Sequence, residues 1–115
     1  MALHQESCAP CRGETGKLSG ADIAVLLPQV AAWKVVQEPA AGQLQPPRLQ
    51  RRFSFKDFVQ AMGFVNRMAE IAEAQGHHPD FTVHYNVVDV SLWTHDVGGL
   101  SRNDFILAAK IDAVS

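Results

Sequence analysis

Apolar residues recur at helical or strand spacing along most of the chain. Ser19 is a residue type that commonly caps a helix, and apolar side chains follow it at helical intervals until Pro28, which should end or distort the helix. Residues 33–37 and 48–53 have the composition of strands. Residues 39–47 contain proline and glycine and are expected to form a connecting loop.

The longest predicted helix begins after Ser54, with Asp57 three residues later, and ends at Gly76, a natural C-terminal stop. One apolar stripe along it is assigned to the core. The stripe consists of Phe55, Phe58, Val59, Met62, Val65, Ala69 and Ala72. Phe64 and Ile71 lie off this stripe, and a second apolar patch on one helix suggests burial against another subunit.

Strand-like alternation returns after this helix. Residues 81–85 and 88–94 alternate apolar and polar positions around a short turn near Asn86, which predicts a hairpin. Ser101 and Asp104 then have the spacing of a helix start. The apolar positions of this last helix are Phe105, Leu107, Ala108 and Ile111.

The order helix–strand–strand–helix–strand–strand–helix predicts an α+β fold, with a four-stranded antiparallel sheet and three helices on one face. The chain has 115 residues, which fits one domain. Residues 1–17 are polar and are expected to form a flexible N-terminal arm, and residues 18–115 to form a single domain.

Composition narrows the classes of function. Hydrophobic residues make up 47% and charged residues 19%, which is typical of a globular chain, and the formal charge is −2. A nucleic-acid-binding domain would be clearly basic, so direct nucleic-acid binding is not expected. The sequence shows neither an apolar run long enough to span a membrane nor a signal-peptide pattern, and a cytoplasmic location is predicted.

The two cysteines lie in the predicted arm. Cys8 and Cys11 form a Cys-x-x-Cys pair, which supplies only half of a tetrahedral zinc site and lies outside any βαβ redox context. Reduced surface thiols are the favoured interpretation. A metal or a disulfide shared between chains is the alternative.

Four of the five histidines fall between positions 77 and 95. Adjacent His77 and His78 would point in different directions, which makes them a poor chelating pair, so no metal is expected. Acid–base chemistry fits better, because Pro79 stiffens the chain after the pair and forces His78 out of helical geometry. His95 would lie at the end of the last strand, and Asp104 could accept a hydrogen bond from an imidazole.

Purely structural roles compete with this interpretation. Asp104 could serve only to support the start of the last helix, and the two roles can coexist. Glu73 could simply be a solvated residue of the long helix. His84 alternates with its neighbours in a strand and is interpreted as a polar-face residue, and Tyr85 as a core or interface residue.

The spacing of these residues resembles a family signature. The pattern is Glu-x-x-x-His-His-Pro followed at fixed gaps by Tyr, His and Asp, formed here by Glu73, His77, His78, Pro79, Tyr85, His95 and Asp104. On these residues the chain resembles the pterin-4a-carbinolamine dehydratases. The resemblance extends from Leu18 to about Ile111.

The resemblance implies an enzyme, a 4a-hydroxytetrahydrobiopterin dehydratase. It would eliminate water from 4a-hydroxytetrahydropterin to give quinonoid dihydropterin, with neither a metal nor a redox cofactor. It also implies that His77 and His95 form the acid–base pair, that His78 positions the substrate and that Asp104 orients a histidine.

The resemblance further implies that Pro79 and Glu73 belong to the substrate-binding side and that the protein is a homodimer or homotetramer. The alternative is a protein of the same fold with weak or no catalysis, which acts as a dimerisation or assembly factor for another protein, for example a Rubisco assembly factor of carboxysomes.

Overall fold

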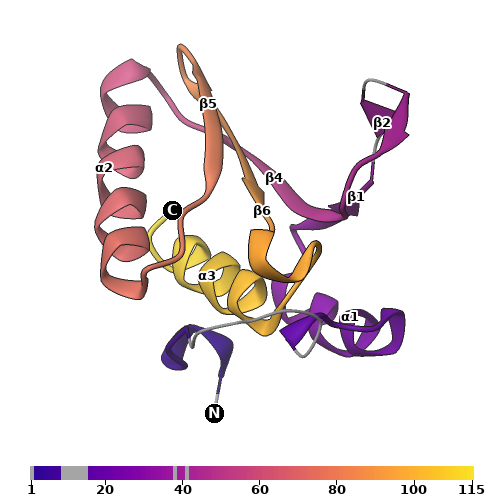
Figure 1. Ribbon diagram of the computed structural model, residues 1–115. Helices are drawn as coiled ribbons and strands as arrows, with labels where there is room; N and C mark the ends of the chain where they lie inside the picture. The colour runs from indigo at the N-terminus through magenta and orange to yellow at the C-terminus, as the bar shows by residue number, and fades with distance from the viewer. Residues whose placement is uncertain (1, 9–15, 38, 41) are drawn as a thin grey trace.

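The computed structural model describes residues 2–8, 16–37, 39–40 and 42–115. Its α+β architecture confirms the predicted fold class, and α2 and α3 lie side by side against the sheet (Figure 1). The helices and strands are α1 (Gly20–Leu26), β1 (Lys34–Val36), β2 (Pro39–Ala40), β3 (Gln43–Leu44), β4 (Arg48–Ser54), α2 (Phe58–Gln75), β5 (Asp80–His84), β6 (Val87–Leu92) and α3 (Arg102–Asp112).

The main sheet has the strand order β1-β4-β6-β5, and every neighbouring pair is antiparallel. Side chains of β4 and β6 alternate between the two faces, as the strand geometry requires. Leu49, Phe53, Val88, Val90 and Leu92 are buried on the helix-covered face. The opposite face presents polar side chains, so one side of the sheet forms the core and the other remains open to solvent.

Most local predictions are confirmed. Helix α1 ends at Leu26 and continues as a 3₁₀ turn, Leu27–Val30, with Pro28 near its start. The β5–β6 hairpin turns at Tyr85 and Asn86, and Asn86 Nδ2 donates to the carbonyl of Phe55 at 2.9 Å. This contact joins the hairpin turn to the segment that enters α2.

The predicted core stripe of α2 was only partly correct. Val65 and Ala72 are buried as predicted, but Phe64, which was assigned to a patch facing another subunit, is fully buried in the core of this chain. The helix begins at Phe58 rather than after Ser54, and Asp57 is the N-cap, accepting from the backbone N–H of Gln60 at 2.9 Å. Val59, assigned to the core, is 77% exposed. The buried face consists of Ala61, Phe64, Val65, Met68 and Ala72. It is selected by aromatic packing, because the ring of Phe64 lies between those of Phe53 and Phe55.

The expected irregular loop between the first two main strands contains a small hairpin instead. Pro39 pairs with Leu44 and Ala40 pairs with Gln43, in antiparallel register. Proline is tolerated there because this two-stranded ribbon leaves outward N–H positions unpaired. The hairpin projects beside the end of β1 (Figure 1).

The N-terminal residues that the structure describes lie beneath α3 (Figure 1). Leu3 is 3% exposed and belongs to the main hydrophobic core. Residues 2–8 of the expected flexible arm are therefore docked on the domain. Cys11 lies outside the described residues, and the domain boundary at residue 18 remains a prediction.

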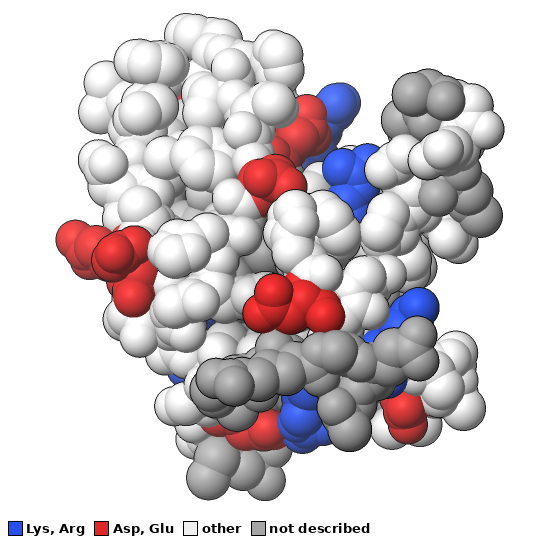
Figure 2. All heavy atoms as spheres, in the orientation of Figure 1, with Lys and Arg blue, Asp and Glu red and all other residues white. Residues whose placement is uncertain are grey.

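Within the described part of the chain, no helix is both long and apolar enough to cross a bilayer. Acidic and basic side chains are mixed on the face shown in Figure 2. No single-sign field of the kind that draws nucleic acid dominates that face.

Candidate functional site

The first histidine of the predicted site is placed by the way α2 ends. Gly76 adopts a left-handed conformation with φ of 64°, which glycine reaches without the steric cost that a side chain imposes. The N–H of His77 then donates to the carbonyl of Ala72, and the N–H of Gly76 to that of Glu73. This pair of bonds is the Schellman motif, and it sets where the chain carrying His77 leaves the helix.

The next residues turn the chain into β5. His78 precedes Pro79, which disfavours helical geometry at His78, and β5 begins at Asp80. The His78 Nε2 atom lies 2.9 Å from Oε2 of Glu73 on the last turn of α2. Both side chains of this pair are largely exposed, at 64% for His78 and 82% for Glu73.

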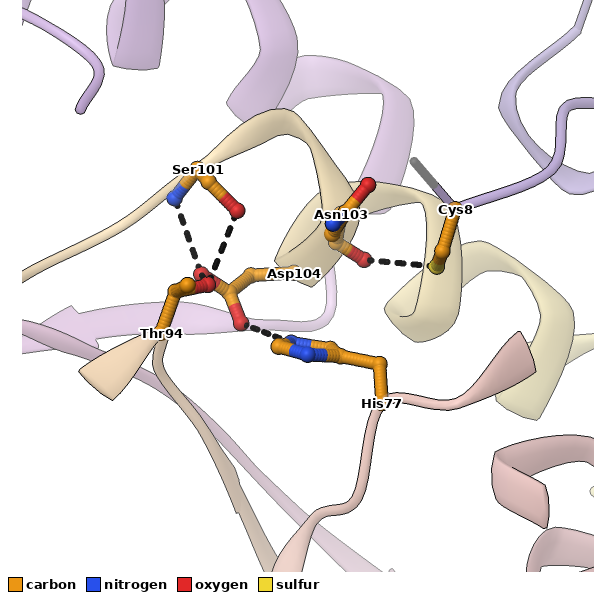
Figure 3. A network of polar contacts seen from close by, with 6 residues as sticks. All are labelled: Cys8, His77, Thr94, Ser101, Asn103 and Asp104. Carbon is orange, nitrogen blue, oxygen red and sulfur yellow. Dashed lines mark hydrogen bonds and ion pairs between the residues drawn. The ribbon is translucent and has the colours of Figure 1, made fainter. Parts of the chain in front are cut away.

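His77 faces the interior of the domain. Its Nε2 atom lies 2.6 Å from Oδ1 of Asp104, whose side chain is 0% exposed, and the His77 side chain is 13% exposed (Figure 3). The second carboxylate oxygen, Oδ2, accepts from the Thr94 hydroxyl and from the backbone N–H of Ser101, both at 2.9 Å. One carboxylate therefore caps the start of α3 and holds His77.

The donors around Asp104 determine the tautomer of His77. The Thr94 hydroxyl donates its one proton to Asp104, so it accepts at 2.8 Å from the hydroxyl of Ser101. A carboxylate surrounded by donors in this way acts as an ionised acceptor. With Asp104 as the acceptor, Nε2 of His77 is the donor, and in the neutral ring Nδ1 is left with a lone pair.

The third predicted histidine comes from the far end of the hairpin. His95 begins a 3₁₀ turn, His95–Val97, directly after Thr94, and Gly98 closes that turn with φ of 66°. The His95 ring lies against the indole of Trp93, with ring centroids 3.7 Å apart and planes at 44°. The indole therefore limits the rotamers open to an imidazole that is otherwise exposed.

These elements surround one pocket of about 340 Å³, within the range of small-molecule sites (~300–1,000 Å³). Its lining residues are Gly76, His77, His78, Pro79, Asp80, Trp93, Thr94, His95 and Asp96. Four of the six residues predicted to form the site line this pocket: His77, His78, Pro79 and His95. Asp104 lies behind His77, and Glu73 contacts His78 from outside the pocket lining.

Sequence reasoning missed three residues of this site. Trp93 lines the pocket and contacts His95, while Thr94 and Ser101 complete the hydrogen bonding of Asp104. A large aromatic residue at the end of an alternating strand, two positions before a candidate histidine, was the available signal for Trp93. Ser101 was recognised only as the start of the last helix and Thr94 was not singled out, because the contact between their hydroxyls depends on how the segment after β6 meets the start of α3.

A larger hollow of about 760 Å³ lies on the open face of the sheet and includes Lys34, Arg48 and Arg52. It is the polar outer surface of four strands, and Asp80 is the residue that it shares with the histidine pocket. Among the described residues, no group of three or more His, Cys, Asp or Glu side chains is arranged to hold a metal ion.

Comparison with known proteins assigns the chain to a family. The family model described as pterin 4 alpha carbinolamine dehydratase matches residues 16–114. The chain therefore belongs to the pterin-4a-carbinolamine dehydratase family, which confirms the resemblance derived from the histidine motif.

Two relatives match over the whole chain. A protein from Gloeobacter violaceus is 43% identical over 100% of this chain and 95% of its own length. A protein from Stenotrophomonas maltophilia is 47% identical over 100% of this chain and 93% of its own length. Both are named as pterin-4-alpha-carbinolamine dehydratases, by names that assign the family and leave the activity unestablished.

Two solved structures share the fold. A transcriptional coactivator/pterin dehydratase from Brucella melitensis superposes with a TM-score of 0.73 at 33% identity, over 84% of this chain and 96% of that one. A pterin dehydratase-like protein identified as a RuBisCO assembly factor in the alpha-carboxysome superposes with a TM-score of 0.58 at 25% identity, over 72% of this chain and 88% of that one.

Proposed function

We propose that this protein is a 4a-hydroxytetrahydropterin dehydratase that works by histidine acid–base catalysis. The substrate loses its C4a hydroxyl as water and the proton on ring N5, and the product is a quinonoid dihydropterin. One proton is delivered and one is removed, with no change in oxidation state. Two positioned imidazoles, the side chains most often used in general acid–base catalysis, meet that need.

A single observation carries the proposal: three imidazoles line one pocket, and a buried carboxylate holds the Nε2 proton of one of them. In this arrangement His77 is a neutral base with its Nδ1 lone pair available. When His77 accepts a proton, the positive charge that forms lies beside the Asp104 carboxylate. That carboxylate stabilises the imidazolium without becoming protonated.

The proton pathway follows from this assignment. Nδ1 of His77 takes the proton from N5 while His95, entering in its protonated form, gives a proton to the departing C4a hydroxyl. The electron pair of the N5–H bond becomes part of the new C4a–N5 double bond, and the C–O bond breaks. Exchange with solvent returns both histidines to their starting protonation states, which the exposure of His95 permits.

The remaining pocket residues position these groups. His78 is the substrate-positioning imidazole, Pro79 keeps the corner between α2 and β5 rigid, and Glu73 holds His78 at the substrate-binding side through its 2.9 Å contact. Trp93 keeps the His95 ring in place. Each positioned proton-transfer group contributes typically ~10²–10⁴ in rate.

Loss of the carbinolamine absorbance, followed with purified protein, tests the proposal. We expect His77→Ala and His95→Ala each to reduce kcat/KM by about 10²-fold or more. His84→Ala is the matched control, because His84 is an exposed histidine of β5 outside the pocket lining, and it should keep full activity. Equal rates in all four proteins would refute the acid–base assignment.

Association of several copies into a homodimer or homotetramer belongs to the same proposal. Phe58 and Val59 of α2 are 49% and 77% exposed, and Tyr85 at the hairpin turn is 65% exposed. The surface above α2 and this turn carries few charged side chains in the view of Figure 2. Burial of this apolar patch against a second copy of the chain would explain why these side chains are exposed in a single copy.

A second candidate function is that of an assembly or dimerisation factor for another protein. It is supported by the relatives of this fold that are described as a transcriptional coactivator and as a RuBisCO assembly factor. Affinity capture that recovers a stoichiometric partner from a protein without carbinolamine turnover would favour this function. Turnover abolished by His77→Ala would favour the dehydratase.

A further inference from the structure

The pair formed by His77 and Asp104 depends on the relative placement of two chain ends. His77 is the second residue after the C-terminus of α2, and Asp104 lies in the first turn of α3. The two residues are 27 positions apart, and they meet through one side-chain contact of 2.6 Å. Any element that joins these two helix ends therefore bears on the geometry of the base.

The docked N-terminal segment, residues 2–8, makes that connection. The backbone N–H of Cys8 donates to Oε1 of Gln75, the last residue of α2, at 2.8 Å. The Cys8 thiol lies 3.7 Å from the carbonyl of Asn103 in α3, next to the His77–Asp104 pair (Figure 3). One residue of the segment thus contacts both helix ends.

A second contact ties the segment to the start of α3. The carboxylate of Glu6 accepts two hydrogen bonds from Arg102, at 2.8 Å from Nε and 2.7 Å from Nη2. This bidentate contact lowers the pKa of Glu6, with hydrogen bonding to Arg102 as the largest cause. Arg102 is the first residue of α3, two positions before Asp104.

The segment is anchored at its other end as well. The buried Leu3 side chain belongs to the core, and Nζ of Lys110 donates to the carbonyl of His4 at 2.8 Å. The segment is therefore held at both ends: residues 3 and 4 are fixed by the core and by Lys110, and residues 6 and 8 contact the ends of α2 and α3. A segment held in this way can transmit rigidity to the residues it contacts.

We infer that residues 2–8 are a positioning element for the dehydration reaction, which holds His77 against Asp104 by joining the ends of α2 and α3 through Gln75 and Arg102. This inference rests on the proposed function, and it adds residues that the histidine motif does not contain. Because a misplacement of about 1 Å can cost 10²-fold in rate, a connection at Gln75, two positions before His77, would affect turnover.

Gln75→Ala tests the connection with little risk to folding, because alanine is favourable inside a helix. We expect kcat to fall about three- to tenfold with KM nearly unchanged, since the substrate-binding surface stays intact. Gln75→Glu keeps an acceptor for Cys8 N–H and should recover kcat to within twofold. Gln60→Ala makes the same substitution at an exposed position at the other end of α2, away from residues 2–8, and should also stay within twofold.

Proton NMR of the free protein supplies a measurement that does not depend on turnover. The Nε2 proton of His77, held by a buried carboxylate, should give a low-field resonance that is identified by its loss in His77→Ala. We expect this resonance to broaden or exchange faster in Gln75→Ala, and to persist in Gln75→Glu and Gln60→Ala.

The possible outcomes distinguish the positioning role of residues 2–8 from the proposed dehydratase function. Unchanged kcat in Gln75→Ala, or a fall in kcat with an unaltered His77 resonance, would overturn the positioning role. If the unmodified protein shows no carbinolamine turnover but the resonance still responds to Gln75→Ala, the proposed function fails and the positioning of His77 by residues 2–8 stands.

Discussion

Two adjacent histidines of the pocket, His77 and His78, each contact a carboxylate. The two contacts are nearly equal in length, but their environments are opposite. His77 and Asp104 meet at 2.6 Å with the carboxylate fully buried, whereas His78 and Glu73 meet at 2.9 Å with both side chains in solvent. An exposed pair typically contributes only about 0–1 kcal/mol. Loss of one partner in a buried network costs more, because the other partners lose their hydrogen bonds.

The difference between the pairs shows what each can do. The buried pair specifies one tautomer and one ring orientation, since Asp104 is also held by Thr94 and by the start of α3. The exposed pair leaves His78 free to adjust to a ligand. We therefore assign proton transfer to the buried pair and substrate positioning to the exposed pair, and three perturbations test this division.

The largest effect is expected from Asp104→Asn. The amide introduces donors among groups that already donate, so the His77 tautomer is no longer imposed and the network loses hydrogen bonds. We expect kcat to fall about 10²- to 10³-fold and the free energy of unfolding to fall by about 1–3 kcal/mol, measured by carbinolamine turnover and urea denaturation.

Glu73→Gln is the matched control for that variant, because it makes the same chemical change at the exposed pair. We expect the free energy of unfolding to change by less than about 0.5 kcal/mol and kcat to stay within a few-fold of the unmodified protein. Similar losses in the two variants would contradict the distinction between the pairs.

A middle-sized effect is expected from Trp93→Ala, which removes the ring that contacts His95. An aromatic contact contributes about 0.5–1.5 kcal/mol, so kcat/KM should fall about three- to tenfold. Trp93→Phe keeps a ring and should lose less. Steady-state kinetics of both variants measures these losses in kcat/KM. Full activity in Trp93→Ala would show that His95 works without the contact from the indole ring.

The smallest effect is expected from Gly76→Ala, which imposes a side chain on a left-handed backbone. No heavy atom outside the immediate chain neighbours lies within 4 Å of the added Cβ, so the cost is conformational, about 1 kcal/mol of unfolding free energy. Gly98→Ala is the counterpart at the His95 end, with φ of 66° and equally open surroundings.

Thermal or urea unfolding should therefore report similar losses for the two glycine variants. Because Gly76 directly precedes the more tightly held histidine, Gly76→Ala should lower kcat more than Gly98→Ala does. A larger fall in kcat for Gly98→Ala would indicate that turnover depends more on the backbone position of His95 than on that of His77.

Local patterns were enough for much of this fold and for most of the pocket. Pro28, Gly76 and the short turn at Asn86 act within a few residues of themselves, so the ends of α1 and α2 and the β5–β6 hairpin follow from them. The spacing from His77 to Asp104 likewise identified the family and the residues that meet at the site.

The prediction of the buried face of α2 was only partly correct, because its sequence carries apolar residues on more than one face. Periodicity alone does not choose between Val59 and Phe64, and both satisfy a helical stripe. Packing decided it, since Phe64 fits between Phe53 and Phe55 while Val59 is left in solvent.

By itself the sequence determined the order of helices and strands, the rigid corner at His78 and Pro79, and the set of histidines, because these depend on neighbours in the chain. Only the tertiary structure decided that His77 is the histidine that Asp104 holds, and that residues 2–8 join two helix ends. Each of those contacts links segments whose meeting depends on how the whole core packs, and local spacing carries no record of it.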